Sequence, residues 1–434
     1  MSKYIGQSVP RYEGLGQVTG MAMYTDDYQL PGMLYAKVLY SPVHKGVIRH
    51  LDLTPAENTP GVVGTLTAGD VPGNNAYGLV PDQPVFTPDH VRYKGERIAA
   101  VVAVDEDTAQ EAVEKIKLDI EEQTPVFDMF EAMKPDAPLV RPGSDSNMWV
   151  FGNGKTVFEV RLGNIEKGLA DADYVVEGRY TNANNDHAPI EPHVSVAYID
   201  DAGRLAFHTE SQAHYFHLGQ LCPVFNLPMS QIVYEGGRVG GGFGSKNDVH
   251  CDHVTGLAAL KFRKPVKYRM TRREHMSYGS KRGAFVFEIK DGVKKDGRIV
   301  ARHFRMWHTG GAYTAFAPYA VEKCATYGLG PYAVPNVFVE GWCVFTNRPI
   351  HSSQRGFAVT NGQSAVELQM NRIAEVLGVD PWEVRFINAW REGDLGPTQF
   401  AVAGAGVIES MKKAAELAGV ELPAHLRAMS SRRR

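Results

Sequence analysis

The residues best suited to chemistry lie in the stretch RVGGGFGSKND, which runs from Arg238 to Asp248. Four glycines surround one aromatic residue, Phe243, so the stretch offers little side chain to a hydrophobic core. A bare backbone can bring its amide N–H groups close to a ligand and stabilise an oxyanion or a metal-oxo group. The same glycines could also form a tight turn between a strand and a helix, and the residues alone leave both interpretations open.

Two common phosphate-binding motifs do not fit this stretch. A Walker loop has Ser or Thr after its Lys, but here Ser245 precedes Lys246 and Asn247 follows it. The dinucleotide fingerprint needs a glycine spacing that the stretch lacks, and no acidic residue follows at the distance of a β-α-β unit.

The composition excludes several classes of protein. The chain has 434 residues, of which 44% are hydrophobic and 22% charged, so it is long enough for two or more globular domains. A net charge of −3 without a basic stripe argues against nucleic-acid binding. The longest apolar run, IAAVVAV from Ile98, is too short to cross a bilayer, and we predict a cytoplasmic protein without a membrane partner. The four scattered cysteines are predicted to be buried small residues.

Hydrophobic patterns predict the elements that position the loop. In residues 1–125, the strand RIAAVVAV, a helix from Asp105 and the strand KIKLDIEE predict a β-α-β unit in a small α/β domain. Residues 126–150, rich in Pro, Asp and Ser, are predicted to be a linker. Residues 151–434 are predicted to be α+β, with antiparallel hairpins early and helices later. Among those helices, one ends at Gly378 and the next begins with Asp-Pro-Trp-Glu.

Together these segments resemble a known family, the molybdenum hydroxylases related to xanthine dehydrogenase and aldehyde oxidoreductase. Its signature loop resembles GGRVGGGFGSK. Its N-terminal hammerhead domain is similar to GQVTGMAMYTDDYQLPGMLYAKVLYSPV, DVPGNNAYG and VRYKGERIAAVVA. Its first molybdopterin-binding domain is similar to HAPIEPHVSVAYI, NRPIHSSQRGFAVTNGQSAVELQMNRIAEVLGVDP and NAWREGD. The resemblance implies an α+β fold, with an α/β hammerhead domain over 1–125 and the first half of a molybdopterin-binding domain, of mixed antiparallel sheets and helices, over 151–434.

The resemblance also implies roles for matching residues. Gln212, at the end of LAFHTESQ, matches a glutamine that hydrogen-bonds an oxygen ligand of the metal, and it is the catalytic candidate of this chain. Arg355 lies where an arginine accompanies the cofactor, and its fixed fork of donors suits pterin carbonyls or phosphate. The cofactor-binding candidates are Gln212, Gly241, Gly242, Phe243, Gly244, Arg355 and Gly356.

Other matching positions bear on the substrate. Asn247 replaces a glutamate of the xanthine-converting members and Gln354 replaces a common aromatic residue, which argues against purine specificity. Gly356 stands where carbon-monoxide dehydrogenases carry a copper-binding cysteine, so that chemistry is excluded. Asn247 and Phe357 are the predicted substrate contacts. Glu191, in IEPH, is predicted to be structural, paired with backbone or an arginine.

The resemblance further implies cofactors and partners. The metal would be held by the dithiolene of the pterin, so no protein ligand to it is expected. Complete molybdenum subunits continue beyond REGD with a Gln-Gly-rich pterin loop and a glutamate that acts as the general base. We therefore expect a second molybdopterin subunit that carries this glutamate, as in nicotinate dehydrogenase, together with an iron–sulfur subunit and an FAD subunit. The pterin is expected in its cytosine dinucleotide form.

The expected activity is hydroxylation of an N-heteroaromatic substrate, nicotinate-like or purine-like, with water as the oxygen donor. Two alternatives stay open. The same fold could reduce an aromatic CoA thioester or oxidise an aldehyde, or the chain could be a non-catalytic scaffold that binds the cofactor. Assays with these substrates and metal analysis of the native complex separate the three.

Overall fold

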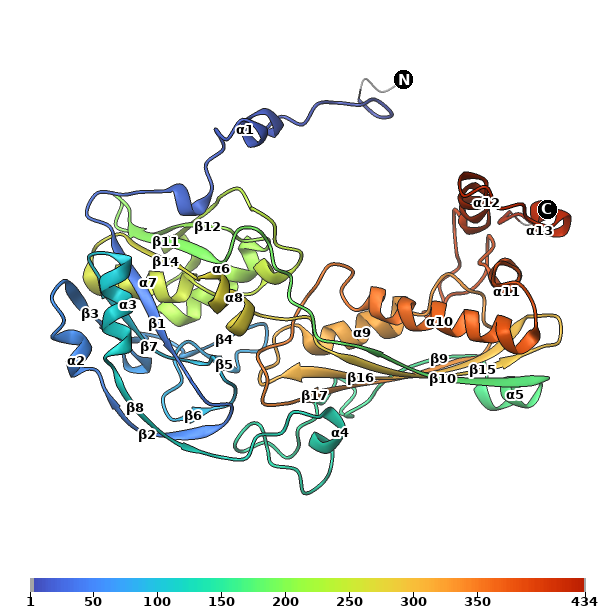
Figure 1. Cartoon of the computed structure of the whole chain (residues 1–434), viewed down its shortest axis with the longest axis horizontal. Coiled ribbons are helices and arrows are strands. Elements are labelled where there is room, and N and C mark those ends of the chain that lie inside the picture. Colours follow the sequence, from blue (N-terminus) through green and yellow to red (C-terminus); the bar gives the residue numbers. More distant parts are fainter. Residues whose placement is uncertain (1–3, 433–434) are drawn as a thin grey trace. The chain divides into compact units, whose positions relative to one another are not determined.

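The computed structural model describes residues 4–432, so the outermost ends of the first and last predicted domains lie outside it. The chain forms two compact units, and each is built from two separate stretches (Figure 1). Unit 1 combines residues 1–123 with 187–279, and unit 2 combines residues 124–186 with 280–434. The domain boundaries predicted near residues 125 and 150 divide the chain into consecutive segments, whereas each unit combines two separate segments. These boundaries remain a prediction.

Unit 1 is built around a seven-stranded mixed sheet. Its order is β13-β12-β11-β14-β1-β7-β3, so strands from both stretches share it. The strands are β1 (Leu34–Tyr40), β3 (Val62–Leu66), β7 (Arg97–Ala103), β11 (Val194–Ile199), β12 (Leu205–Thr209), β13 (Ile232–Gly236) and β14 (Val266–Arg269). Smaller sheets pair β2 (Gly46–Asp52) with β6 (His90–Val91) and β8 (Lys117–Glu122), and β4 (Ala76–Tyr77) with β5 (Gln83–Pro84).

Helices cover both faces of this sheet. The helices of unit 1 are α1 (Gly14–Val18), α2 (Thr54–Glu57), α3 (Glu106–Glu114), α6 (His214–Phe225), α7 (Asp252–Phe262) and α8 (Arg272–Tyr278). Side chains of a strand alternate between its faces, and in β7 Val102 packs into the core under α6 and α7 while Val101 packs against α3. Because α6 and α7 lie between strands in the chain, the predicted order of strands first and helices later is wrong for residues 187–279.

The predicted β-α-β unit is also wrong, although its three elements are confirmed. Asp105 caps α3 by accepting a hydrogen bond from the Thr108 amide at 2.7 Å, as the sequence indicates. However, β7 belongs to the seven-stranded sheet and β8 to the three-stranded sheet. Hydrophobic periodicity identifies a strand, but it does not identify the sheet in which that strand pairs.

Unit 2 is a five-stranded sheet with helices packed against both of its faces. The order is β10-β15-β16-β17-β9, from β9 (Phe158–Leu162), β10 (Tyr174–Asn182), β15 (Phe285–Val293), β16 (Ile299–Gly311) and β17 (Val337–Phe345). The helices are α4 (Met129–Ala132), α5 (Ile165–Ala170), α9 (Ala317–Tyr327), α10 (Val359–Leu377), α11 (Pro381–Asn388), α12 (Val407–Leu417) and α13 (Ala424–Ala428). Helices α9 and α10 contribute Val321, Val366 and Met370 to the core above the sheet. Within residues 4–432, no helix is both long and apolar enough to span a bilayer.

The predicted ends of two helices are confirmed in unit 2. Gly378 ends α10 with φ +66°, a left-handed conformation that glycine adopts without steric cost. Asp380 then caps α11 by accepting from the Trp382 amide at 2.7 Å, with Pro381 at the first helical position. The turn at Asp296-Gly297 joins the antiparallel strands β15 and β16, in agreement with the antiparallel hairpins predicted for residues 151–434.

Two buried histidines of unit 2 lead to a prediction about acid stability. Burial lowers the pKa of His308 to about 3 and of His351 to about 4. The unfolded chain therefore binds more protons than the folded chain between pH 6.5 and about 4, and the folded state loses stability as the pH falls through this window. Each histidine should contribute a slope of about 1.4 kcal/mol per pH unit. We expect urea unfolding between about pH 7 and pH 4 to show this loss, and His351→Gln to reduce the slope. An unchanged slope in that variant would contradict the assignment.

Candidate functional site

The pairing of two strands brings Gln212 and the glycine-rich loop together. Strands β12 and β13 are parallel neighbours, so their carboxyl ends meet at the same edge of the sheet. Gln212 follows β12, and residues 237–247 follow β13. Two backbone hydrogen bonds join the segments, from the Gly237 amide to the Thr209 carbonyl at 2.9 Å and from the Gln212 amide to the Lys246 carbonyl at 2.9 Å. The sequence separates these residues, but the sheet places them side by side.

The loop has an unusual backbone that leaves several amide donors without a hydrogen bond. Gly241, Phe243 and Gly244 have φ values of +93°, +55° and +107°, and the strained value at Phe243 is rare for a residue with a side chain. Within residues 4–432, the amides of Gly241, Gly242 and Phe243 make no hydrogen bond. Successive free N–H groups of this kind form a concave site for an anion or an oxygen ligand.

Gln212 packs directly against this loop. Its Oε1 accepts a hydrogen bond from the Gly244 amide at 3.0 Å. A Cβ at position 242 would lie 2.3 Å from that same oxygen, so Gly242 is required to make room for Gln212. The amide of Gly244, which we expected to face a ligand, is therefore occupied, while the Nε2 donors of Gln212 remain available. The donor set consists of Nε2 and the amides of Gly242 and Phe243, and it suits a ligand that presents acceptor oxygens.

A cavity of about 640 Å³ opens beside the loop within unit 1. Its walls are mainly apolar, and they include Tyr24, Ile190 and Val239 together with the ring of Phe243, which is 43% exposed. Asn247, a predicted substrate contact, ends the short 3-10 turn Ser245–Asn247, and its carbonyl accepts from His217 Nε2 at 3.1 Å. The cavity offers a flat apolar group a place to stack against Phe243.

A buried ionic network lies beneath the loop. Lys246, whose side chain is fully buried, contacts Glu191 Oε2 at 2.6 Å and Glu210 Oε2 at 2.7 Å. Burial raises the pKa of the Glu210 carboxyl well above its ordinary value, and the Lys246 ammonium offsets this only partly. The expected pairing of Glu191 with backbone is observed at the Gly240 amide, but its cationic partner is a lysine rather than an arginine. Its structural role stays a prediction. Glu210 and Lys246 were not among the predicted site residues, because nothing in the local sequence shows which charged residues meet in the core.

Arg355, Gly356 and Phe357 belong to unit 2, where they form the turn before α10. Gly356, Phe357 and Ala358 have φ values of +91°, +45° and +67°, so three consecutive residues are left-handed. Arg355 is exposed, and within the described chain its guanidinium makes no hydrogen bond or ion pair. Phe357 packs against the core near Tyr319, with ring centroids 5.2 Å apart. The three residues and the glycine-rich loop thus belong to different units.

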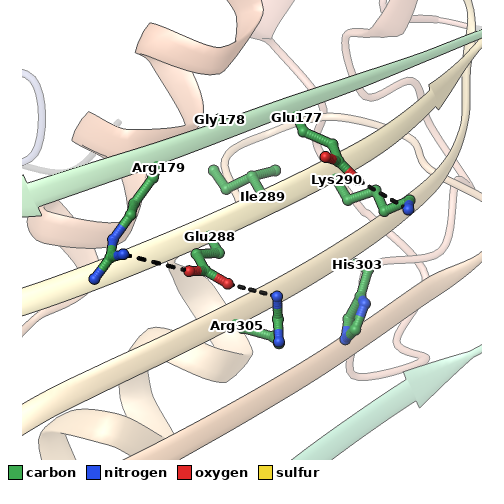
Figure 2. Close-up of a pocket in the computed structure, with 8 residues that line it drawn as sticks. All are labelled: Glu177, Gly178, Arg179, Glu288, Ile289, Lys290, His303 and Arg305. Carbon is green, nitrogen blue, oxygen red and sulfur yellow. Dashed lines mark hydrogen bonds and ion pairs between the residues drawn. The ribbon is translucent and has the colours of Figure 1, made fainter. Parts of the chain in front are cut away.

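A second hollow, of about 530 Å³, lies on the face of the unit 2 sheet opposite α9 and α10, and Figure 2 shows its lining. Charged side chains from neighbouring strands pair across it: Glu177 contacts Lys290 at 2.9 Å, and Arg305 and Arg179 both contact Glu288. The charged side chains of this hollow are paired with one another across the strands. We therefore interpret the hollow as a structural feature of the sheet.

The cysteines and histidines provide no further site. All four cysteines are free, and burial raises the pKa of the Cys324 and Cys343 thiols to about 12, which makes them unreactive. Cys251 is also buried, whereas Cys222 is half-buried. Within the described range, no three His, Cys, Asp or Glu side chains are grouped so that they could hold a metal ion.

Comparisons with known proteins agree with this architecture. A family model described as the molybdopterin cofactor-binding domain matches residues 151–389. A second model, the α/β hammerhead domain of aldehyde oxidase and xanthine dehydrogenase, matches residues 19–124. The aldehyde oxidoreductase structure from Desulfovibrio gigas superposes with a TM-score of 0.89 at 29% identity and covers 94% of this chain and 46% of that one.

Two relatives differ in length. The nicotinate dehydrogenase large molybdopterin subunit of Eubacterium barkeri is 33% identical over 95% of this chain and 96% of its own length. A probable xanthine dehydrogenase subunit of Bacillus subtilis is 34% identical over 91% of this chain but 52% of its own length. The chain likewise spans about half the length, or less, of other curated relatives that it matches. Because a molybdopterin domain model matches more than half of its residues and a relative is similar over almost its full length, the chain belongs to the xanthine dehydrogenase and aldehyde oxidoreductase family of molybdenum hydroxylases, as a molybdopterin-binding subunit.

Proposed function

We propose that this chain is the molybdopterin-binding subunit of a hydroxylase that acts on an N-heteroaromatic substrate. The observation that carries the proposal is the donor set of the loop, in which the free amides of Gly242 and Phe243 lie beside the Nε2 donors of Gln212. When bound, the molybdenum cofactor would supply the redox chemistry that takes an oxygen atom from water to an electron-poor ring carbon.

The residues of this chain would bind and orient the cofactor and the substrate. The amides of Gly242 and Phe243 and the Gln212 amide group would donate hydrogen bonds to acceptor oxygens of the cofactor, and they need no reorganisation because the loop already holds them. The exposed Arg355 guanidinium would contribute a fork of donors to pterin or phosphate oxygens, next to Gly356. Phe243 and the apolar cavity would exclude water and stack against a ring, and Asn247 and Phe357 are proposed to contact the substrate.

The general base is proposed to lie on another subunit. Glu210 is buried against Lys246, and Glu191, which lines the cavity, already accepts hydrogen bonds at Oε2 from the Gly240 amide and from Lys246, so we assign structural roles to both carboxylates. The chain is similar to a relative named as a large molybdopterin subunit. We infer a second molybdopterin subunit that carries the catalytic glutamate, and iron–sulfur and FAD subunits that carry the electrons away. The cofactor form would be the cytosine dinucleotide, and the compartment would be the cytoplasm, where the four free cysteines stay reduced.

An aldehyde oxidoreductase is the second candidate, because the Desulfovibrio gigas enzyme of that name is similar over 94% of this chain. The N-heteroaromatic assignment is preferred because the relative matched over 96% of its own length is named for nicotinate.

Purification of the native complex through this chain tests the proposal. We expect about one molybdenum per chain, co-purifying subunits, and turnover of nicotinate or a related ring that exceeds turnover of aldehydes, purines or aryl-CoA esters. Aldehyde turnover alone would favour the second candidate. A complex without molybdenum would contradict both and favour a scaffold.

A further inference from the structure

One carboxylate joins the two ends of the glycine-rich loop. Glu191 Oε2 accepts a hydrogen bond from the Gly240 amide at 2.6 Å and another from Lys246 Nζ at 2.6 Å. The Glu191 amide in turn donates to the Gly240 carbonyl at 3.1 Å. Gly240 precedes the free amides of the loop and Lys246 follows them, so a side chain from another segment spans the base of the loop.

The lysine end of this brace is anchored in the sheet. The Lys246 side chain is fully buried, and its ammonium also contacts Glu210 Oε2 at 2.7 Å. The other oxygen of Glu210 accepts from the Val194 amide at 3.2 Å and lies 3.1 Å from His193 Nδ1, at the start of β11. A buried ammonium cannot leave its carboxylates without a large desolvation cost. The end of the loop is therefore fixed to the unit 1 sheet.

The brace also reaches Gln212. The Gln212 amide donates to the Lys246 carbonyl at 2.9 Å, and its side chain holds the Gly244 amide at 3.0 Å. Any displacement of Lys246 would move Gln212 with it.

We propose that Glu191 is a positioning residue, which clamps Gly240 to Lys246 and so holds the loop amides and Gln212 in an arrangement that can bind one ligand. The clamp itself is a property of the loop, and only the identity of the ligand rests on the proposed function. The Glu191 side chain is 10% exposed, and both hydrogen bonds to its Oε2 serve the loop.

Two substitutions separate a clamp from a simple counter-charge. Glu191→Gln removes the charge that compensates Lys246. Glu191→Asp keeps the charge but is one methylene shorter, so it cannot reach both the Gly240 amide and the Lys246 ammonium. If Glu191 acted only as a counter-charge to Lys246, Glu191→Asp would keep the loop in its parent arrangement. If Glu191 acts as a clamp, Glu191→Asp would not keep that arrangement. Glu235→Gln is the matched control, because Glu235 is half exposed and pairs with His208 rather than with a residue of the loop.

Amide hydrogen exchange on the full chain, purified with its partners, measures the clamp directly. Both Glu191 variants should raise exchange in peptides covering residues 238–247 by about 10- to 100-fold, because a charge-assisted hydrogen bond is lost. Peptides from β11 and β12 and the Glu235→Gln control should exchange as in the parent chain. Molybdenum content should fall in both Glu191 variants.

Three results would overturn the proposal. Unchanged exchange in residues 238–247 would show that Glu191 does not hold the loop. Equal acceleration throughout unit 1 would show a general loss of stability. Loss of turnover with unchanged exchange and unchanged molybdenum would assign Glu191 to proton transfer. A parent complex that lacks molybdenum would refute the proposed function. The clamp could still be tested on that complex, because the measurement of amide exchange does not require the metal.

Discussion

Gly242→Val is expected to leave the chain folded and to remove the molybdenum cofactor and turnover together. A Cβ at this position would lie 2.3 Å from Gln212 Oε1, and the branched valine side chain would force Gln212 away from the loop. The substitution would then free the Gly244 amide, displace the Nε2 donors and cover the amide of residue 242. Losing one preorganised donor costs about 10²- to 10³-fold in rate, so we expect at least this loss.

Metal analysis, turnover and the circular-dichroism melting curve of the purified complex check this result. The matched control is Gly219→Val, because no atom lies within 4 Å of a Cβ at that position of α6. The control should keep both molybdenum and activity. Full molybdenum content and full turnover in Gly242→Val would mean that this loop does not bind the cofactor.

Arg302→Met should cause a large loss of stability in unit 2. The Arg302 guanidinium and the Asp291 carboxylate form a bidentate pair, with N···O distances of 2.8 and 3.0 Å, and both side chains are fully buried between the unit 2 sheet and α10. Methionine would leave the aspartate charge buried without its partner. Breaking a buried pair in this way costs about 3–5 kcal/mol of unfolding free energy.

Arg305→Met is the matched control for this prediction. Arg305 lies on the same strand, but it faces the charged hollow of Figure 2, where it is 43% exposed and pairs with Glu288. Its loss should cost only about 0–1 kcal/mol, because water screens an exposed pair. Adding Asp291→Asn to Arg302→Met should recover part of the loss. Equal costs for the two arginine variants, measured by urea unfolding, would contradict the argument from burial.

Local features of the fold can be predicted from the sequence, because they depend on neighbouring residues. The caps at Asp105 and Asp380 and the glycine stop at Gly378 each follow from a few adjacent side chains. The sheet to which β8 belongs does not, since strand pairing depends on distant segments.

The candidate site, too, can be predicted from the sequence only in its local features. The glycine-rich stretch is recognisable as a loop suited to close approach, and the family resemblance points to Gln212. The contact between Gln212 and Gly242 follows from the parallel pairing of β12 with β13, which no local pattern reveals. The burial of Lys246 between Glu191 and Glu210 likewise requires three separate segments, so the sequence indicates only that Glu191 is structural.

The mixed origin of the unit 1 sheet has a consequence for synthesis. Strand β1 pairs with β7 on one side and with β14 on the other, where Leu34 is aligned with Val266. While the nascent chain emerges, β1 and β7 can pair early, but the other edge of β1 stays open until β14 leaves the ribosome, roughly 10 to 50 s later at ordinary elongation rates. An open edge of this kind invites pairing with other chains. The cell must therefore shield that edge during translation, and a fragment truncated before β14 would carry it permanently.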